Sequence, residues 1–207
     1  MKKLFVFLFS LILSVVFSTS ALAYDVKIDG IYYNLISKGK TAEVTSGEEK
    51  YSGQVVIPSS ITVEGKEYTV TSIGNMAFQG CSGLKSITIP NCVTYVGYRA
   101  FYKCSGLTSV TIPNSVTSIG DGAFGGCSGL TTITVDADNP IYDSRNNCNA
   151  IIETATKILL YGCNNTVIPS SVTSIGENAF YECSGLTSVT IPNSVTSIGE
   201  WAFWECI

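Results

Sequence analysis

Residues 111–133 read TIPNSVTSIGDGAFGGCSGLTTI, and this pattern recurs along the chain with a period of 23 residues. Residues 88–110 read TIPNCVTYVGYRAFYKCSGLTSV, and residues 167–189 read VIPSSVTSIGENAFYECSGLTSV. Incomplete copies occupy residues 70–87 and 190–207. A fixed period of roughly 20 to 50 residues is typical of repeat proteins, in which each unit stacks on its neighbours.

The unit carries its own fold signal. Residues 107–112 read LTSVTI, which places apolar side chains at the L-x-x-L-x-L spacing of leucine-rich repeats. Val110 and Ile112 would point into the core of such a strand, and Pro113 would end it because proline has no N–H to donate. One unit cannot bury its apolar face alone. We therefore predict a β-rich leucine-rich-repeat solenoid, a right-handed coil of short strands and turns.

Phenylalanine and cysteine each recur once per unit, and we predict an inward ladder for both. The members are Phe78, Phe101, Phe124, Phe180 and Phe203, with Cys81, Cys104, Cys127, Cys183 and Cys206. Free cysteine is among the most buried residue types, and parallel side chains do not readily meet disulfide geometry, so we expect reduced, buried thiols. Cys92, Cys148 and Cys163 lie outside this register. Cys148 and Cys163 flank a predicted hairpin, and the sequence leaves open whether they form a disulfide.

The repeat spacing also divides the chain. The recurring cysteines are 23, 23, 56 and 23 residues apart, so one interval contains a 33-residue insertion. We predict an N-terminal β cap at 24–69, with a hairpin turn at Asp29-Gly30, and leucine-rich repeats at 70–133. The insertion at 134–166 would hold a β-hairpin with strands at 149–153 and 157–161. Leucine-rich repeats resume at 167–207, and the last one is truncated.

The first residues match a secretory signal peptide. Lys2 and Lys3 precede an apolar run at 4–17, and Ala21-Leu22-Ala23 supplies a small-x-small cleavage pattern. The run is short for a membrane span, which needs about 20 residues, although an uncleaved anchor is the alternative. We expect cleavage after residue 23, a secreted or cell-surface protein, and no membrane span in the mature chain.

Composition excludes several classes of function. The chain carries 12 basic and 16 acidic residues without a basic stripe, which argues against nucleic acid as a partner. It has no histidine, so it cannot form Ser-His-Asp or Cys-His catalytic groups or histidine-ligated metal sites. Asp136, Asp138 and Asp143 lack the glycine and distal glutamate of a calcium loop. We expect no catalytic residue, no metal and no cofactor.

The phrase IPNSVTSIG-xx-AF-xx-CSGLTSV resembles the repeat of BspA-like bacterial surface leucine-rich-repeat proteins. The resemblance covers residues 70–133 and 167–207, and the segments DGIYYN and CNNTVIPSSVTSIG also look like parts of that family. It implies a solenoid exposed on the cell. It further implies an adhesin that contacts host matrix proteins or other bacteria.

Two surfaces could carry such binding. Between repeats, differences concentrate in two dipeptides, one before Ala-Phe and one before Cys. Their aromatic and charged members predict a protein-binding ridge of Tyr98, Arg99, Tyr102, Lys103, Tyr181, Glu182, Trp201 and Trp204. The alternative surface is the outward strand face, formed by Ser86, Thr88, Ser109, Thr111, Thr132, Thr134, Ser188 and Thr190. Both sets could also be tolerant surface positions without a ligand.

The predicted function is that of a secreted or surface binding protein, an adhesin for host extracellular proteins, mucin, glycans or other cells. A structural spacer on the cell surface with no specific ligand is the alternative. A glycan-active enzyme built on a pair of carboxylates is a more distant one, because no acidic pair is marked by a motif.

Overall fold

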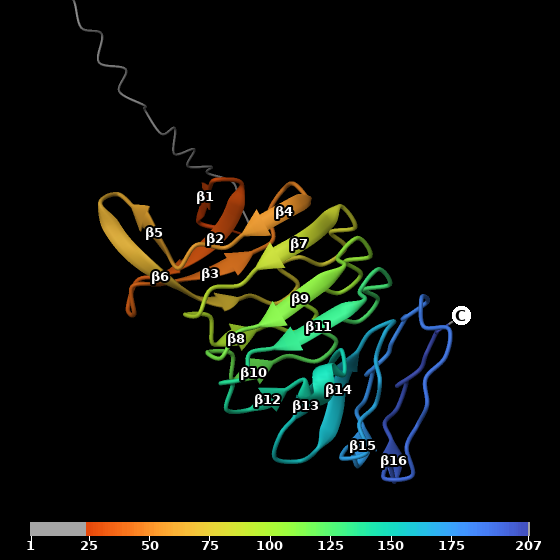
Figure 1. Ribbon diagram of the computed structural model, residues 1–207. Coiled ribbons are helices and arrows are strands. Elements are labelled where there is room, and N and C mark those ends of the chain that lie inside the picture. The colour runs from red at the N-terminus through yellow and green to blue at the C-terminus, as the bar shows by residue number, and fades with distance from the viewer. Residues whose placement is uncertain (1–23, 207) are drawn as a thin grey trace, which may run out of the picture.

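A computed structural model describes residues 24–206, so the predicted signal peptide lies outside the described residues. Coils of short strands and turns follow one another from the N-terminal strands to the C-terminal coil (Figure 1). No α-helix occurs between residues 24 and 206, where the only helical turn is the 3-10 segment η1, Arg145–Asn147. The leucine-rich-repeat fold expected from the 23-residue period is confirmed.

Antiparallel strands cover the N-terminal end of the coils. They are β1 (Val26–Ile28), β2 (Ile31–Ile36), β3 (Thr41–Thr45), β5 (Ser60–Val63) and β6 (Lys66–Ile73). β1 pairs with β2 across a turn at Asp29 and Gly30, which have φ values of 48° and 80°. β3 then pairs in parallel with β6, and β6 pairs in parallel with the first short strand of the coils. The cap therefore continues directly into the repeat sheet.

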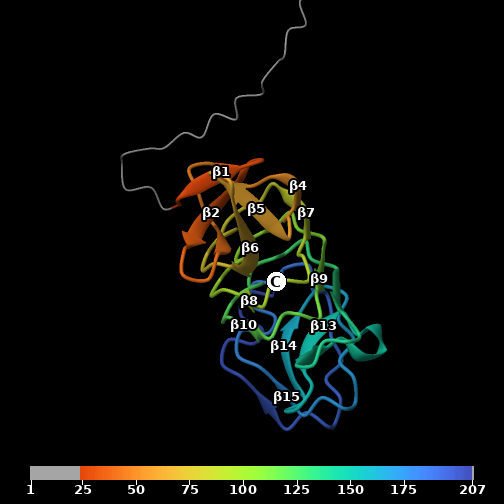
Figure 2. The same ribbon diagram turned by 90° about the vertical axis from the view of Figure 1, so that its left-hand side faces the viewer.

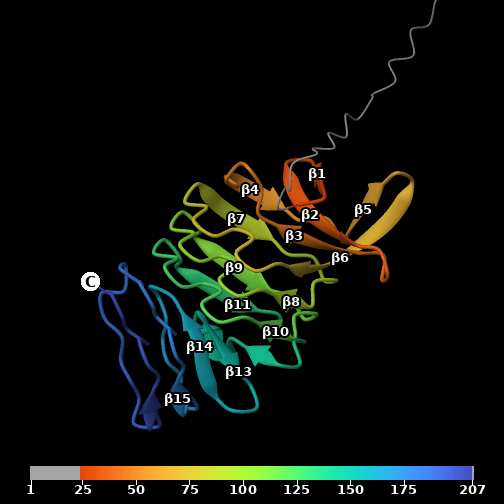
Figure 3. The same ribbon diagram turned by 180° about the vertical axis from the view of Figure 1, so that it is seen from behind.

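Before the insertion, each coil contributes a strand to one or both of two parallel arrays. The longer strands are β4 (Gly53–Val56), β7 (Leu84–Thr88), β9 (Ser109–Ile112) and β11 (Thr132–Val135). The shorter strands are β8 (Tyr95–Val96) and β10 (Ser118–Ile119). β9 and β11 pair so that equivalent repeat positions lie opposite each other, as Val110 lies opposite Ile133. Figure 3 shows both arrays running down the molecule from the cap.

A third sheet follows the insertion. Its strands, in order, are β12 (Tyr142–Asp143), β13 (Ala150–Glu153), β14 (Ile158–Gly162), β15 (Ser174–Ile175) and β16 (Ser197–Ile198). β13 and β14 form the predicted antiparallel hairpin, and β14 then pairs in parallel with β15. Ile158 lies opposite Ser174 just as Ser118 lies opposite Tyr95, so β14 occupies the place of a repeat's short strand. Figures 1 and 2 show the last coils beyond this hairpin.

The phenylalanine ladder is real but is not continuous. Phe78, Phe101 and Phe124 stack at centroid distances of 5.0 and 5.3 Å, and Phe180 stacks on Phe203 at 5.0 Å. Between the two stacks, the ring of Tyr161 meets Phe124 edge-on at 5.5 Å. The prediction of one ladder was therefore wrong at this point, because the insertion places an aromatic ring between the stacks.

The core is divided at the same place. Phe124 belongs to a large apolar cluster that begins in the cap, whereas Phe180 belongs to a smaller cluster that extends to Ala202. Backbone bonds show how the insertion separates the coils. Phe101 N donates to Ala123 O at 2.8 Å in the regular stack, but the carbonyl of Ala179 accepts from Gly162 N at 2.8 Å. β14 thus enters the stack where Phe124 would otherwise donate.

Four of the recurring thiols, those of Cys81, Cys104, Cys127 and Cys183, are buried inside the coils. Cys104 Sγ donates to Phe78 O at 3.0 Å, and Cys127 Sγ donates to Phe101 O at 3.1 Å. Burial raises the pKa of the Cys104 and Cys183 thiols to about 12. All eight cysteines are free thiols, including Cys148 and Cys163, which the structure leaves unbonded.

The last coil departs from the predicted burial. Cys206 and Phe203 are half-buried rather than buried, because no further coil covers that face in the described chain. Cys206 nevertheless keeps the repeat's contact, with its thiol donating to Phe180 O at 2.9 Å.

Candidate functional site: an aromatic cleft at the coil corner

The predicted ridge lies at the corner of each coil, in the loop that contains Ala-Phe. In both variable dipeptides the second residue has a left-handed backbone. The φ values are 50° for Arg99, 58° for Lys103, 53° for Glu182 and 54° for Trp201. Side chains other than glycine rarely adopt this conformation, which costs on the order of 1–2 kcal/mol per residue. A residue other than glycine that adopts this unfavourable conformation at a variable position is a candidate for function.

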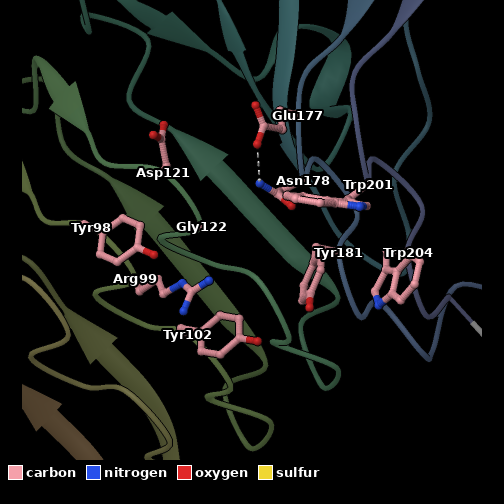
Figure 4. A pocket seen from close by; sticks show the side chains of 10 residues that line it. All are labelled: Tyr98, Arg99, Tyr102, Asp121, Gly122, Glu177, Asn178, Tyr181, Trp201 and Trp204. Atoms are coloured by element: carbon pink, nitrogen blue, oxygen red, sulfur yellow. Dashed lines mark hydrogen bonds between the residues drawn. The ribbon is translucent and has the colours of Figure 1, made fainter.

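The corners do not form a flat ridge. They enclose a cleft of about 540 Å³, which Figure 4 shows with its lining side chains. The lining residues are Tyr98, Arg99, Tyr102, Asp121, Gly122, Glu177, Asn178, Tyr181, Trp201 and Trp204. Coils on both sides of the insertion therefore contribute to one site.

One wall is a cation between two aromatic rings. The Arg99 guanidinium carbon lies 5.1 Å from the Tyr98 ring centroid and 4.8 Å from the Tyr102 ring centroid. Both distances are within the range of cation–π attraction. The rings therefore hold the guanidinium in place, with its N–H groups at the cleft (Figure 4).

The opposite wall is formed by Tyr181, Trp201 and Trp204. Trp201 and Trp204 are 51% and 50% exposed, although large apolar rings are normally covered. In Figure 4 these three rings lie across the cleft from Tyr98, Arg99 and Tyr102. Indole rings carry an apolar face and one N–H donor, which makes them common anchors of binding sites.

The coil between the walls is recessed because its corner reads Asp121-Gly122-Ala-Phe-Gly125-Gly126. Gly126 has φ of 69°, and a Cβ there would lie 2.9 Å from Lys103 Cγ and 3.0 Å from Glu182 Oε2. A Cβ on Gly125 would lie 3.2 Å from the Tyr102 ring. The glycines thus let side chains from the coils on either side fold over this backbone.

Contacts across the recess join the two walls at one end. Gly126 N donates to Tyr181 O at 2.9 Å, and the rings of Tyr102 and Tyr181 are 6.2 Å apart. Tyr102 Oη donates to Glu182 Oε1 at 3.1 Å, and Lys103 Nζ forms an ion pair with the same oxygen at 3.0 Å. Burial and the bonds to Tyr181 and Glu182 raise the pKa of Tyr102 to about 12.

The insertion holds the walls apart at the other end. Tyr161 Oη donates to Gly120 O at 2.7 Å and accepts from Ala123 N at 3.3 Å. It therefore bonds the backbone at the base of the Asp121-Gly122 turn. The cleft results from this arrangement: the coils meet at Gly126 and Tyr181 but are separated at Asp121 and Glu177.

The sequence model of the BspA type leucine rich repeat region matches residues 57–158 and 159–207, in six copies. The chain belongs to this family. The two matched ranges together run through the whole of the insertion predicted at 134–166. No curated protein is detectably similar to the chain in sequence.

Several solved structures resemble this BspA-type chain, and three of them follow. The T. pallidum leucine rich repeat protein TpLRR is 27% identical over 85% of this chain and 64% of that one, with a TM-score of 0.50. This chain therefore spans less than two thirds of TpLRR. The pneumococcal vaccine antigen PcpA is 17% identical over 90% and 68%, with a TM-score of 0.50. A Faecalibacterium prausnitzii leucine rich cell surface protein is 23% identical over 86% and 73%, with a TM-score of 0.38.

The predicted ridge of this BspA-type chain maps largely onto the cleft. Its members that line the cleft are Tyr98, Arg99, Tyr102, Tyr181, Trp201 and Trp204. Lys103 and Glu182 instead pair with each other beside it. Sequence reasoning omitted the lining residues Asp121, Gly122, Glu177 and Asn178. They belong to the same variable dipeptides. A prediction that included every member of these dipeptides, aromatic or not, would have contained them.

The alternative strand face is regular only before the insertion. Ser86, Ser109 and Thr132 are register partners, and Thr111 lies opposite Thr134. Thr88 pairs with Val56 of β4. The prediction of an outward strand face was wrong for Ser188 and Thr190, because both residues lie outside any strand. No backbone hydrogen bond joins residues 187–190 to another described segment, so the ladder does not continue past the insertion.

Between residues 24 and 206, no helical segment has the length and apolar character of a membrane span. No group of three or more Asp, Glu, Cys or His side chains in that part of the chain is arranged to hold a metal ion.

Proposed function

We propose that this BspA-type chain is an exported surface adhesin and that the aromatic cleft is its ligand site. The Lys-rich start, apolar run and Ala-Leu-Ala pattern of residues 1–23 support export. The partners would be host extracellular proteins, mucin, glycans or other cells. The observation that carries the proposal is the convergence of variable aromatic residues, from coils on both sides of the insertion, on one cleft.

The conformational and solvation cost of the cleft residues favours a ligand-binding role over that of a passive spacer. Trp201 and Trp204 are half exposed to water, and Arg99 and Trp201 also have left-handed backbones. The Asp121-Gly122 turn occupies the same repeat position with glycine, which removes that cost. A passive spacer would gain stability from glycine at these positions. The aromatic and cationic side chains are therefore better explained by binding.

A matched pair of variants tests the proposal. The cleft variant is Tyr98→Ser, Trp201→Ser and Trp204→Ser, and the control is Ser109→Ala and Thr111→Ala on the strand face. Both sets are exposed, so circular dichroism and melting should show folded proteins. We expect the cleft variant to lose attachment to mucin or matrix-coated surfaces and the control to keep it. The reverse result would assign binding to the strand face, and unchanged attachment by both would favour a spacer.

We propose binding without catalysis. The chain has no histidine for proton transfer or nucleophile activation. Release of sugar products during incubation with mucin would contradict this proposal and favour a glycan-active enzyme.

A further inference from the structure

Some charged side chains that line the cleft form no ion pair within the described residues. The chain has two arginines. Arg145 forms an ion pair with Asp143, and Lys103 forms one with Glu182. Arg99 has no ion pair and no side-chain hydrogen bond among residues 24–206, although it is held between two rings at the cleft wall. A fixed guanidinium with free N–H groups is suited to a planar anion such as a carboxylate.

Acceptor groups lie at another end of the cleft. Asp121 and Glu177 are exposed lining residues, and neither has an ion pair in the part of the chain described. Asn178 Nδ2 donates to Glu177 Oε1 at 3.3 Å, which leaves other carboxylate oxygens open. Figure 4 places these carboxylates away from Arg99. They would accept hydrogen bonds from a ligand with several hydroxyl groups.

The third feature is the aromatic surface of the wall opposite Arg99. The face of an aromatic ring is electronegative and attracts partly positive hydrogens, such as the C–H groups on the flat face of a sugar ring. The half-exposed indoles of Trp201 and Trp204 offer two such faces.

We propose that the cleft binds a glycan that carries a carboxylate, such as a terminal sialic acid. Arg99 would bind the carboxylate, the tryptophans would pack against a sugar ring, and Asp121 and Glu177 would accept hydroxyl donors. A peptide has one backbone N–H per residue and no dense set of hydroxyls to donate to Asp121 and Glu177. This inference rests on the proposed function, because it names the ligand of the same cleft.

The chain provides its own reporter. Its two tryptophans both line the cleft, so intrinsic tryptophan fluorescence reports events at this site. The full mature chain is titrated with 3′-sialyllactose, with lactose as the neutral probe and a proline-rich peptide as the third arm. We expect 3′-sialyllactose to change the emission at a concentration at least about 10-fold lower than lactose, since a charge-assisted hydrogen bond to the carboxylate strengthens binding by about that factor or more.

Arg99→Gln removes the charge, and Lys66→Gln is the control. Lys66 is exposed in the cap and has no ion pair within the described chain, so this control makes the same change in net charge away from the cleft. We expect Arg99→Gln to abolish the preference for 3′-sialyllactose, and Lys66→Gln to retain it. Added salt should weaken the sialylated probe more than lactose.

Other outcomes overturn specific parts of the inference. Equal affinity for both sugars, unchanged by Arg99→Gln, would exclude the acidic ligand but keep the cleft as a binding site. A response to the proline-rich peptide alone would replace the glycan by a protein partner. If no probe changes the emission and the cleft variant still attaches to mucin, both the glycan inference and the cleft site fail. If the cleft variant loses attachment while the probes are silent, only the glycan inference fails.

Discussion

Phe124 shows how a single side chain supports the BspA-type coil. It is 4% exposed, stacks on Phe101 at 5.3 Å and meets Tyr161 at 5.5 Å. We predict that Phe124→Ala lowers the free energy of unfolding by about 3–5 kcal/mol, the usual cost of deleting a buried phenylalanine. Phe203→Ala is the control and should cost less, because Phe203 is half-buried. Urea denaturation of both variants checks this, and equal losses would mean that burial does not set the cost.

The buried thiols predict a dependence on alkaline pH. Burial raises the pKa of Cys104 and Cys183 from 9.0 to about 12, so the unfolded chain loses these protons first. The stabilisation is complete below about pH 9 and is lost as the pH rises toward 12. At pH 10 we expect a loss of about 1 kcal/mol per thiol relative to pH 7. Urea midpoints at both pH values measure it. A Cys104→Ala, Cys183→Ala variant should show a smaller loss, and an equal one would assign the effect to other groups.

At the scale of elements, β14 connects the two parts of the solenoid through Tyr161. Its hydroxyl bonds both Gly120 O and Ala123 N, and the residue is 6% exposed. We predict that Tyr161→Phe costs about 1 kcal/mol of unfolding free energy, because these polar groups lose a partner. Tyr95→Phe is a matched control, since its hydroxyl bonds Asn75 at the surface. Equal denaturation midpoints for both variants would contradict a structural role for the Tyr161 hydroxyl.

How far the elements follow from sequence depends on whether they repeat. The pairing of Ser109 with Thr132 follows from the 23-residue period, because identical coils stack in register. The hairpin of β13 and β14 also follows, from alternating apolar residues around a turn. The place of β14 does not, since nothing in the insertion specifies that Gly162 bonds Ala179.

The candidate site, too, could be predicted from the sequence only in part. Variation between otherwise identical coils singles out Tyr98, Arg99 and Trp201 without any structure. The cleft itself depends on the contact between Gly126 and Tyr181, which lie on opposite sides of the insertion. Such a contact is fixed by three-dimensional packing, so local patterns could predict the lining residues but not the hollow between them.

At the scale of the whole molecule, the N-terminal residues predict export. We expect the mature protein to begin at Tyr24, because cleavage should follow Ala23 in the Ala-Leu-Ala pattern. Intact-mass measurement of protein recovered from the cell surface or medium checks the start. Material that still begins at Met1 would indicate an uncleaved anchor, and Ala23→Arg should block cleavage if the predicted site is correct.

The two apolar clusters predict that the molecule unfolds in two parts. Phe78, Phe101 and Phe124 stabilise the larger cluster, whereas Phe180 belongs to the smaller one, whose outer members Val195 and Phe203 are only partly buried. In repeat proteins each coil is stabilised mainly by its neighbours, so an interrupted stack loses cooperativity at the interruption. We predict faster amide hydrogen exchange at residues 168–206 than at residues 84–133.

Substitutions in the two apolar clusters distinguish unfolding in two parts from unfolding of the whole molecule at once. Phe180→Ala should further raise exchange at residues 168–206 and leave the amides of β7 and β9 nearly unchanged. Phe101→Ala should act on β7 and β9 instead, because its ring stacks on Phe78 and Phe124 and not on Phe180. If either substitution raised exchange equally in both parts, the contacts of Gly126 with Tyr181 and of Lys103 with Glu182 would be strong enough to couple them. The two walls of the cleft would then unfold together.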